Sequence, residues 1–134
     1  MSTPPILLVD DNHDDLFILK RLLTRAGLKN GFVTFDHARD CLHYLESALR
    51  SPESSLLPAA IFSDKSMPDF GGFDLLKWVR DQPELATLPF VLLSTVAEAP
   101  EKKRAAKLGV TAFLEKFPPP HVFSAIFGLQ ERGS

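Results

Sequence analysis

The chain has 134 residues, and a composition of 45% hydrophobic and 24% charged residues is ordinary for a globular protein. The formal net charge of −2 excludes a general electrostatic attraction to nucleic acid or to an anionic membrane surface. One cysteine, Cys41, excludes an internal disulfide, and no apolar run reaches the roughly 18 residues of a membrane helix. We therefore expect a single domain over residues 1–134, with a core from about residue 5 to about residue 130, in the cytoplasm.

In the N-terminal half, short apolar runs alternate with amphipathic stretches. The run from Ile6 to Val9 predicts a strand buried on both faces. Residues 14–26 predict a helix that Asn12 caps and Gly27 ends. The next predicted elements are a strand from Phe32 to Phe35, a helix over residues 38–50, a polar connection from Ser51 to Pro58 and a strand from Ala59 to Ser63.

The same alternation continues through the C-terminal half. The predicted elements are a helix from Phe73 to Arg80, a strand from Phe90 to Leu93, a helix from Pro100 to Leu108, a strand from Thr111 to Leu114 and a helix from Val122 to Leu129. Five strand–helix units in succession predict an α/β fold, in which helices cover both faces of a parallel sheet.

Polar side chains follow four of the predicted strands at the points where the strands end. Asp10 and Asp11, Asp64, Ser94 and Lys116 hold these positions, whereas Asp14 and Asp15 are interpreted as helix N-terminal charge. In an open α/β sheet the carboxyl ends of the strands meet at one crevice. Clustered carboxylates need a cation, and their oxygen ligands favour Mg²⁺. A lysine suits a phosphoryl oxygen, so the pattern predicts an aspartate that accepts a phosphoryl group.

Four segments carry a resemblance to a known family. The stretches "ILLVDDN", "IFSDKSMPDFGG", "PFVLLST" and "AFLEKF" together resemble the receiver domain of two-component response regulators. The resemblance extends from about Ile6 to about Leu129. It implies a flavodoxin-like, doubly wound (βα)5 sheet with the strand order 2-1-3-4-5, an order that receivers share with flavodoxin.

The resemblance also implies a role for each matching residue. It makes Asp64 the phosphoacceptor, and it makes Asp10, Asp11, Asp64 and the backbone carbonyl of Ser66 the ligands of Mg²⁺ or Mn²⁺. Lys116 would contact the phosphoryl group, and Ser94 and Phe113 would move when the domain switches. Met67, Pro68 and Gly72 would shape the loop, with Gly72 in a backbone conformation that is closed to other residues.

The function implied is that of a standalone signalling switch, without an output domain, rather than of an enzyme. A sensor histidine kinase or a phosphotransfer protein would supply the phosphoryl group, and the domain would slowly hydrolyse its own acyl phosphate. Phosphorylation would change the surface formed by residues 100–108, 111–114 and 122–129, which would bind a downstream protein or form a homodimer. We expect no direct contact with nucleic acid or membrane. The helix around Tyr44 and the Ser51 to Pro58 connection resemble regulators that partner phytochrome kinases.

Three positions depart from the family pattern. Phe117 follows Lys116 where the family has proline, and because a non-proline cis bond costs about 3 kcal/mol, we expect a trans Lys116–Phe117 bond or a cis bond moved to Phe117–Pro118. Thr95 stands where the family has a smaller residue. Ser66 and Val96 occupy positions that tune phosphate lifetime in the family, and neither predicts a rate.

Other functions are open on the sequence alone. The Lys116–Phe117 departure is compatible with a receiver-like interaction module that works without phosphorylation. A Mg²⁺-dependent phosphohydrolase would also use an aspartyl nucleophile, but no second aspartate stands two residues after Asp64. A flavin carrier of the same sheet order is disfavoured, because the acidic first loop would repel a phosphate.

Overall fold

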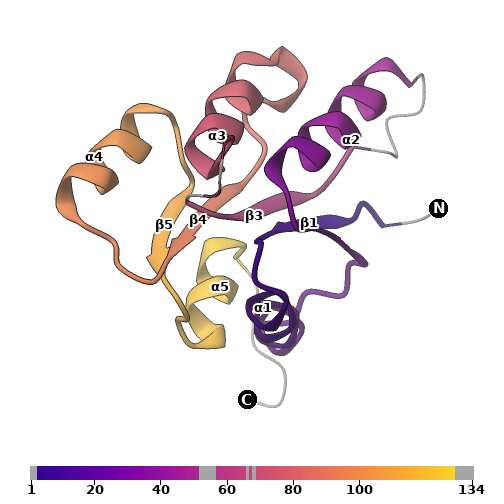
Figure 1. Ribbon diagram of the computed structural model, residues 1–134. Helices are drawn as coiled ribbons and strands as arrows, with labels where there is room; N and C mark the ends of the chain where they lie inside the picture. Colours follow the sequence, from indigo (N-terminus) through magenta and orange to yellow (C-terminus); the bar gives the residue numbers. More distant parts are fainter. Residues whose placement is uncertain (1–2, 52–56, 66, 68, 129–134) are drawn as a thin grey trace.

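Five parallel strands form one sheet in the order β2-β1-β3-β4-β5, which confirms the predicted order (Figure 1). The computed structural model describes residues 3–51, 57–65, 67 and 69–128. The strands are β1 Ile6–Val9, β2 Phe32–Phe35, β3 Ala60–Asp64, β4 Phe90–Ser94 and β5 Ala112–Glu115. The helices are α1 His13–Arg25, α2 Ala38–Arg50, α3 Gly72–Asp81, α4 Ala99–Lys107 and α5 Pro120–Ile126, with a short 3-10 helix, η2, at Pro83–Leu85.

Alternate side chains of the strands pack into two separate cores, one on each face of the sheet. On one face, Leu7, Ile61 and Leu92 pack against α2 and α3. On the other face, Leu8 and Phe62 pack against α1 and α5. Figure 1 shows α1 and α5 together on one side of the sheet and α2 and α3 on the other. This arrangement explains why the strands are apolar at successive positions, since both faces are covered.

Outside α5, every observed element bound lies within one residue of the predicted one. The bounds of β1, β2 and α2 are as predicted. Strand β4 is one residue longer than predicted, and β3 and β5 are shifted by one residue towards the C-terminus, so that the three strands end at Asp64, Ser94 and Glu115. These polar residues join the ladder because their backbones still pair with the neighbouring strand. Helix α5 ends at Ile126, and Leu129, where we expected its end, lies outside the described residues.

The turn between β1 and α1 is fixed by Asn12. Its side chain accepts a hydrogen bond from the Asp15 N–H at 3.1 Å, as the predicted cap requires, and its own N–H donates to Asp10 Oδ1 at 2.9 Å. Gly27 follows the helix with a φ of 103°, which glycine adopts without steric cost. Among the described helices, none is both long and apolar enough to cross a membrane.

Candidate functional site: an acidic cluster with a buried lysine

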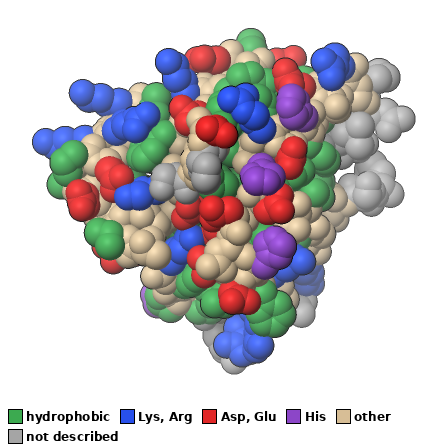
Figure 2. All heavy atoms as spheres, in the orientation of Figure 1, with side chains coloured by type: hydrophobic (Ala, Val, Ile, Leu, Met, Phe, Trp, Pro, Cys, Tyr) green, Lys and Arg blue, Asp and Glu red, His purple; other side chains and the backbone are tan. Residues whose placement is uncertain are grey.

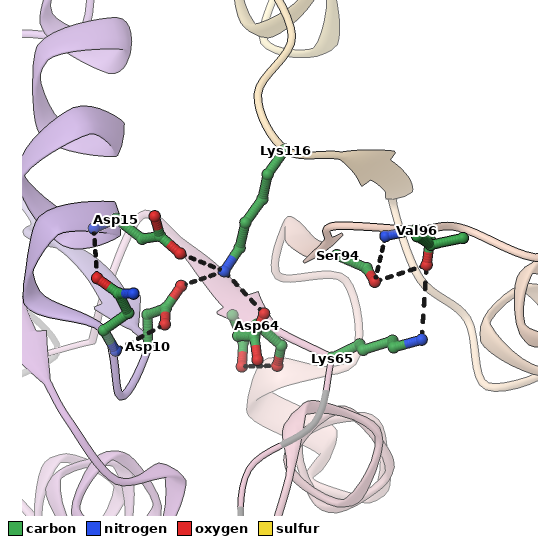
Figure 3. A network of polar contacts seen from close by, with 9 residues as sticks. Asp10, Asp15, Asp64, Lys65, Ser94, Val96 and Lys116 are labelled. Carbon is green, nitrogen blue, oxygen red and sulfur yellow. Dashed lines mark hydrogen bonds and ion pairs between the residues drawn. The ribbon is translucent and has the colours of Figure 1, made fainter.

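The carboxyl ends of β1, β3 and β5, together with the first turn of α1, place one lysine among three carboxylates (Figure 3). The ammonium nitrogen of Lys116 lies 2.5 Å from Asp10 Oδ2, 2.9 Å from Asp64 Oδ1 and 3.0 Å from Asp15 Oδ2. Only 7% of the Lys116 side chain is exposed. The predicted convergence of Asp10, Asp64 and Lys116, which are far apart in the sequence, is therefore observed.

Asp10, Asp11 and Asp64 form a carboxylate cluster at the same edge of the sheet. One carboxylate oxygen of each residue lies within 4.8 Å of the others, and the three range from buried Asp10 to exposed Asp11. Figure 2 shows acidic side chains gathered near the middle of this face of the molecule. Such an all-oxygen donor set suits a hard divalent cation such as Mg²⁺ or Mn²⁺. The fourth predicted ligand, the Ser66 carbonyl, lies outside the described residues.

Burial and charge act in opposite directions on the two ionisable groups at the centre. Burial raises the pKa of Asp10, and its hydrogen bonds from Lys116 and Asn12 offset this only in part. Burial alone would lower the pKa of Lys116, but its hydrogen bonds to Asp10, Asp64 and Asp15 outweigh that effect and raise it. Lys116 is therefore a permanent positive charge beside Asp64, and a further cation would favour the ionised form of Asp10.

Ser94 ends β4 beside this cluster, and it is buried with 2% exposure. Its hydroxyl donates to the Val96 carbonyl oxygen at 2.6 Å and accepts from the Val96 N–H at 3.2 Å. The hydroxyl thus closes the turn between β4 and α4 (Figure 3). Thr95 and Val96 are exposed on this turn, and 54% of Val96 is accessible.

The loop after Asp64 is tied to both β4 and α4. The Lys65 N–H donates to the Leu93 carbonyl at 2.9 Å, and the Lys65 ammonium lies 2.6 Å from Glu101 Oε2 on α4. Met67, one of the predicted loop-shaping residues, packs against the α2–α3 core. Pro68 lies outside the described residues. Asp69 has a φ of 68°, which lies in the left-handed region of the backbone.

Gly72 has a different reason to be glycine from the one we predicted. Its φ is not positive, so the expectation of a conformation closed to other residues is wrong. The reason is a close approach: a Cβ atom on Gly72 would lie 2.2 Å from the carbonyl oxygen of Asp64 and 2.8 Å from Leu92 Cδ2. Helix α3 therefore begins against the backbone that carries Asp64, and only glycine leaves room for this packing.

Phe113, the predicted switch residue, is half-buried on β5. Its ring meets the ring of Phe73 edge-on, with the centroids 6.1 Å apart. The guanidinium carbon of Arg104, on α4, lies 4.3 Å from the centroid of the Phe73 ring. Phe113 on β5 therefore contacts α3 directly through Phe73, and Phe73 in turn contacts Arg104 on α4.

The Lys116–Phe117 peptide bond is cis, so both expected arrangements, a trans bond here or a cis bond moved to Phe117–Pro118, are wrong. The preference for trans is local, whereas tertiary contacts hold the chain on both sides of this bond. The Lys116 N–H donates to the Ser94 carbonyl at 2.7 Å, its ammonium reaches the carboxylates, and Phe117 packs against the α1–α5 core.

Asp15 is the functional neighbour that sequence reasoning missed. We interpreted it as helix N-terminal charge, and it does lie in the first turn of α1. Its carboxylate, however, is also the third partner of Lys116. Both roles need an acidic residue at the start of a helix that follows β1, so the sequence pattern alone does not separate them. The Lys65–Glu101 pair was missed because its members are far apart in the sequence and each resembles a solvated charge.

The sheet order 2-1-3-4-5 defines the flavodoxin-like class of α/β proteins, and sequence comparison narrows this class to one family. The sequence model of the response regulator receiver domain family matches residues 6–126. The rice two-component response regulator ORR8 (Oryza sativa subsp. indica) is 34% identical over 95 residues, which are 71% of each chain. The transcriptional regulatory protein GltR of Pseudomonas aeruginosa is 32% identical over 95% of this chain, which spans about half (49%) of GltR.

Solved structures agree with the sequence comparison. The bacteriophytochrome response regulator AtBRR has a TM-score of 0.79 and 29% identity, with 96% of this chain and 92% of AtBRR covered. The Mn²⁺-bound form of response regulator Rcp1 shares the fold, with a TM-score of 0.76, 19% identity and coverage of 98% and 97%. The chain belongs to the response regulator receiver domain family. Members of this family are phosphoacceptor signalling domains, and they bind Mg²⁺ or Mn²⁺ at an acidic pocket.

Proposed function

We propose that this receiver is a phosphorylation switch in which Asp64 accepts a phosphoryl group from a phosphohistidine on a sensor kinase or a phosphotransfer protein. The observation that carries the proposal is the position of the Lys116 ammonium, 2.9 Å from Asp64 Oδ1 and beside the carboxylate cluster. This is the placement that a lysine needs in order to balance charge on a phosphoryl group carried by Asp64.

In the proposed reaction a carboxylate oxygen of Asp64 forms a bond to phosphorus as the bond from phosphorus to the imidazole nitrogen breaks. The product is an acyl phosphate, and the departing imidazole takes up a proton. Asp10, Asp11, Asp64 and the Ser66 carbonyl would hold a Mg²⁺ or Mn²⁺ ion that neutralises phosphoryl oxygens. Lys116 adds a fixed positive charge. The Ser94 hydroxyl, which donates to the Val96 carbonyl oxygen in the unphosphorylated protein, would donate to a phosphoryl oxygen instead.

The likeness to AtBRR supports a particular kind of donor. AtBRR is a bacteriophytochrome response regulator, and at 29% identity it aligns with nearly all of this chain. We propose a phytochrome-type sensor kinase as the donor, in the cytoplasm. The domain would also lose its phosphoryl group slowly by its own hydrolysis. The geometry favours this function over a module that works without phosphorylation, because Lys116 lies at Asp64 although phenylalanine follows it.

A simple labelling experiment tests the proposal. Incubation of the purified protein with acetyl phosphate and Mg²⁺ should add one phosphoryl group per chain, observed by intact-protein mass spectrometry. The same incubation with a chelator should leave the mass unchanged, because the crowded carboxylates then repel the donor. The label should be lost in neutral hydroxylamine, which cleaves acyl phosphates. Steady turnover of a small phosphate ester would instead support a phosphohydrolase, and no Mg²⁺-dependent label would contradict the proposal.

The proposed output surface is formed by α4, β5 and α5, and α4 is its least anchored element. Only Ala105 of its nine residues is buried. Two polar side chains on one side of the helix tie it to the site instead: Glu101 pairs with Lys65, and Arg104 stacks on Phe73. Lys65 follows Asp64 directly in the chain. A movement of the backbone at Asp64 would therefore reach the Lys65–Glu101 ion pair that positions α4. We propose that a downstream protein, or a second copy of the chain, binds this surface.

Glu101→Gln is expected to loosen α4 in the unphosphorylated protein. The Lys65 hydrogen bond lowers the pKa of Glu101, so Glu101 is charged at neutral pH and the substitution removes an ion pair. Amide hydrogen exchange over residues 99–107 should become about two- to fivefold faster, the range expected for a partly exposed pair. Glu98→Gln is the matched control, because the Glu98 side chain makes no cap hydrogen bond. Equal exchange in the two variants would contradict the anchoring role of the pair.

A further inference from the structure

Three carboxylates share the Lys116 ammonium, but only two of them belong to the acidic cluster. Asp10 and Asp64 are members of the cluster formed with Asp11. Asp15 is not, although its Oδ2 lies 3.0 Å from the same ammonium. The Asp15 carboxylate is also less buried, with 23% of its side chain exposed compared with 6% for Asp10. The ammonium therefore has one partner that does not depend on the carboxylates available to a metal ion.

Hydrogen bonds of Asn12 connect the turn that carries Asp15 to the side chain of Asp10. The N–H of Asn12 donates to Asp10 Oδ1 at 2.9 Å, and the Asn12 side chain accepts from the Asp15 N–H at 3.1 Å. One residue thus links the backbone position of Asp15 to the side chain of Asp10. This linkage fixes the start of α1, so the approach of Asp15 to Lys116 is set by the fold and not by a freely moving surface side chain.

We infer that Asp15 is a positioning residue for Lys116, which keeps the ammonium beside Asp64 when a divalent cation occupies the acidic cluster. This inference rests on the proposed function, because it assumes that the cluster binds a divalent cation. A cation there competes with the ammonium for Asp10 and Asp64, since both are positive and the oxygens are shared. Asp15 lies outside the cluster and does not share its carboxylate with the cation, so it becomes the principal partner of Lys116.

If Asp15 positions Lys116, then neutralising Asp15 should weaken metal binding. In the metal-free protein, neutralising Asp15 leaves the ammonium with Asp10 and Asp64. With the cluster occupied, the same change leaves the ammonium only carboxylates that it shares with the cation, in a site where 7% of its side chain is exposed. The substitution therefore harms the metal-bound protein more than the metal-free protein, and it must weaken metal binding.

Asp14 provides a matched control for this effect. It precedes Asp15 in the same first turn of α1, and its side chain is exposed to solvent. Asp14→Asn removes the same charge from the same turn as Asp15→Asn, without touching the Lys116 contact. The difference in Mg²⁺ affinity between the two variants therefore measures the contact with Lys116. The general loss of negative charge is common to both variants, and salt screens its effect at the surface.

Isothermal titration calorimetry with MgCl₂ tests the inference without any phosphoryl donor. Asp15→Asn should weaken Mg²⁺ binding about tenfold, the size expected for a charge-assisted hydrogen bond, and Asp14→Asn should weaken it less than about twofold. In a Lys116→Met background the effect of Asp15→Asn should shrink towards that of Asp14→Asn, because Asp15 acts through Lys116. Urea unfolding of each metal-free variant separates a loss of fold from a loss of affinity.

The outcomes separate the inference from the proposed function. If wild type binds Mg²⁺ and Asp15→Asn binds it as tightly as Asp14→Asn does, the positioning role is wrong and the phosphorylation switch is unaffected. An equal effect of Asp15→Asn with and without Lys116 also overturns the inference, because Asp15 then acts directly on the metal. If wild type binds no Mg²⁺ at millimolar concentration, both proposals lose their common premise.

Discussion

Asp64→Asn is expected to abolish the Mg²⁺-dependent labelling of this receiver by acetyl phosphate. The asparagine amide lacks the charged oxygen that attacks phosphorus, and the substitution also removes one of the three clustered carboxylates. The label should fall to background, at least about 100-fold below wild type, as expected when the nucleophile itself is removed. Intact-protein mass spectrometry under the wild-type conditions measures the result. The fold should survive, since Lys116 retains Asp10 and Asp15 as partners.

The control for this experiment is Asp69→Asn, which makes the same chemical change in the same loop. Asp69 is exposed and has a φ of 68°, and asparagine adopts this conformation about as readily as aspartate does. Asp69→Asn should therefore be labelled like wild type. If Asp64→Asn were labelled to the wild-type level in the presence of Mg²⁺, the acceptor would be another residue, and peptide mapping of the label would identify it.

The strand-end residues show how much of the site the sequence predicts. Asp10, Asp64 and Lys116 each follow a short apolar run, and the rule that parallel strands place their carboxyl ends together brings them to one edge. That rule needs only the order of elements, which the alternating pattern of apolar runs makes plain. The structure confirms the edge and the strand order. It also places the carboxyl ends of β3, β4 and β5 one residue further along the chain than predicted, because backbone pairing continues at a polar residue.

The remaining features of the site depend on contacts between residues that are far apart in the sequence, and local sequence patterns do not predict such contacts. Asp15 pairs with a lysine 101 residues away, and Lys65 pairs with a glutamate 36 residues away. The Lys116–Phe117 bond is cis against its local preference, and it lies between residues that contact distant parts of the chain. The sequence predicts the wrong reason for Gly72, because a glycine needed for a close approach and a glycine needed for its φ look the same in sequence.

Gly72→Ala is the substitution expected to damage the fold most directly. Helix propensity alone would favour alanine at the first position of α3 by at most about 0.5–1 kcal/mol, the value for a helix interior. The added Cβ, however, would lie 2.2 Å from the backbone carbonyl oxygen of Asp64, and a backbone atom has no rotamer by which to move aside. Overpacking of this kind costs about 1–3 kcal/mol, and backbone overlap belongs at the upper end. We therefore expect the free energy of unfolding to fall by about 2 kcal/mol.

Urea unfolding measures this change, and Gly31→Ala is its control. A Cβ atom on Gly31 would meet nothing within 4 Å, so the stability of that variant should stay within about 0.5 kcal/mol of wild type. The clash predicts a second effect at the site, since relieving it requires α3 to move away from the end of β3. Asp64 would shift with its carbonyl, and a displacement of about 1 Å in a reacting group reduces rates by about 100-fold. Wild-type stability together with wild-type labelling in Gly72→Ala would show that α3 can begin elsewhere, and that the close packing against Asp64 does not position the site.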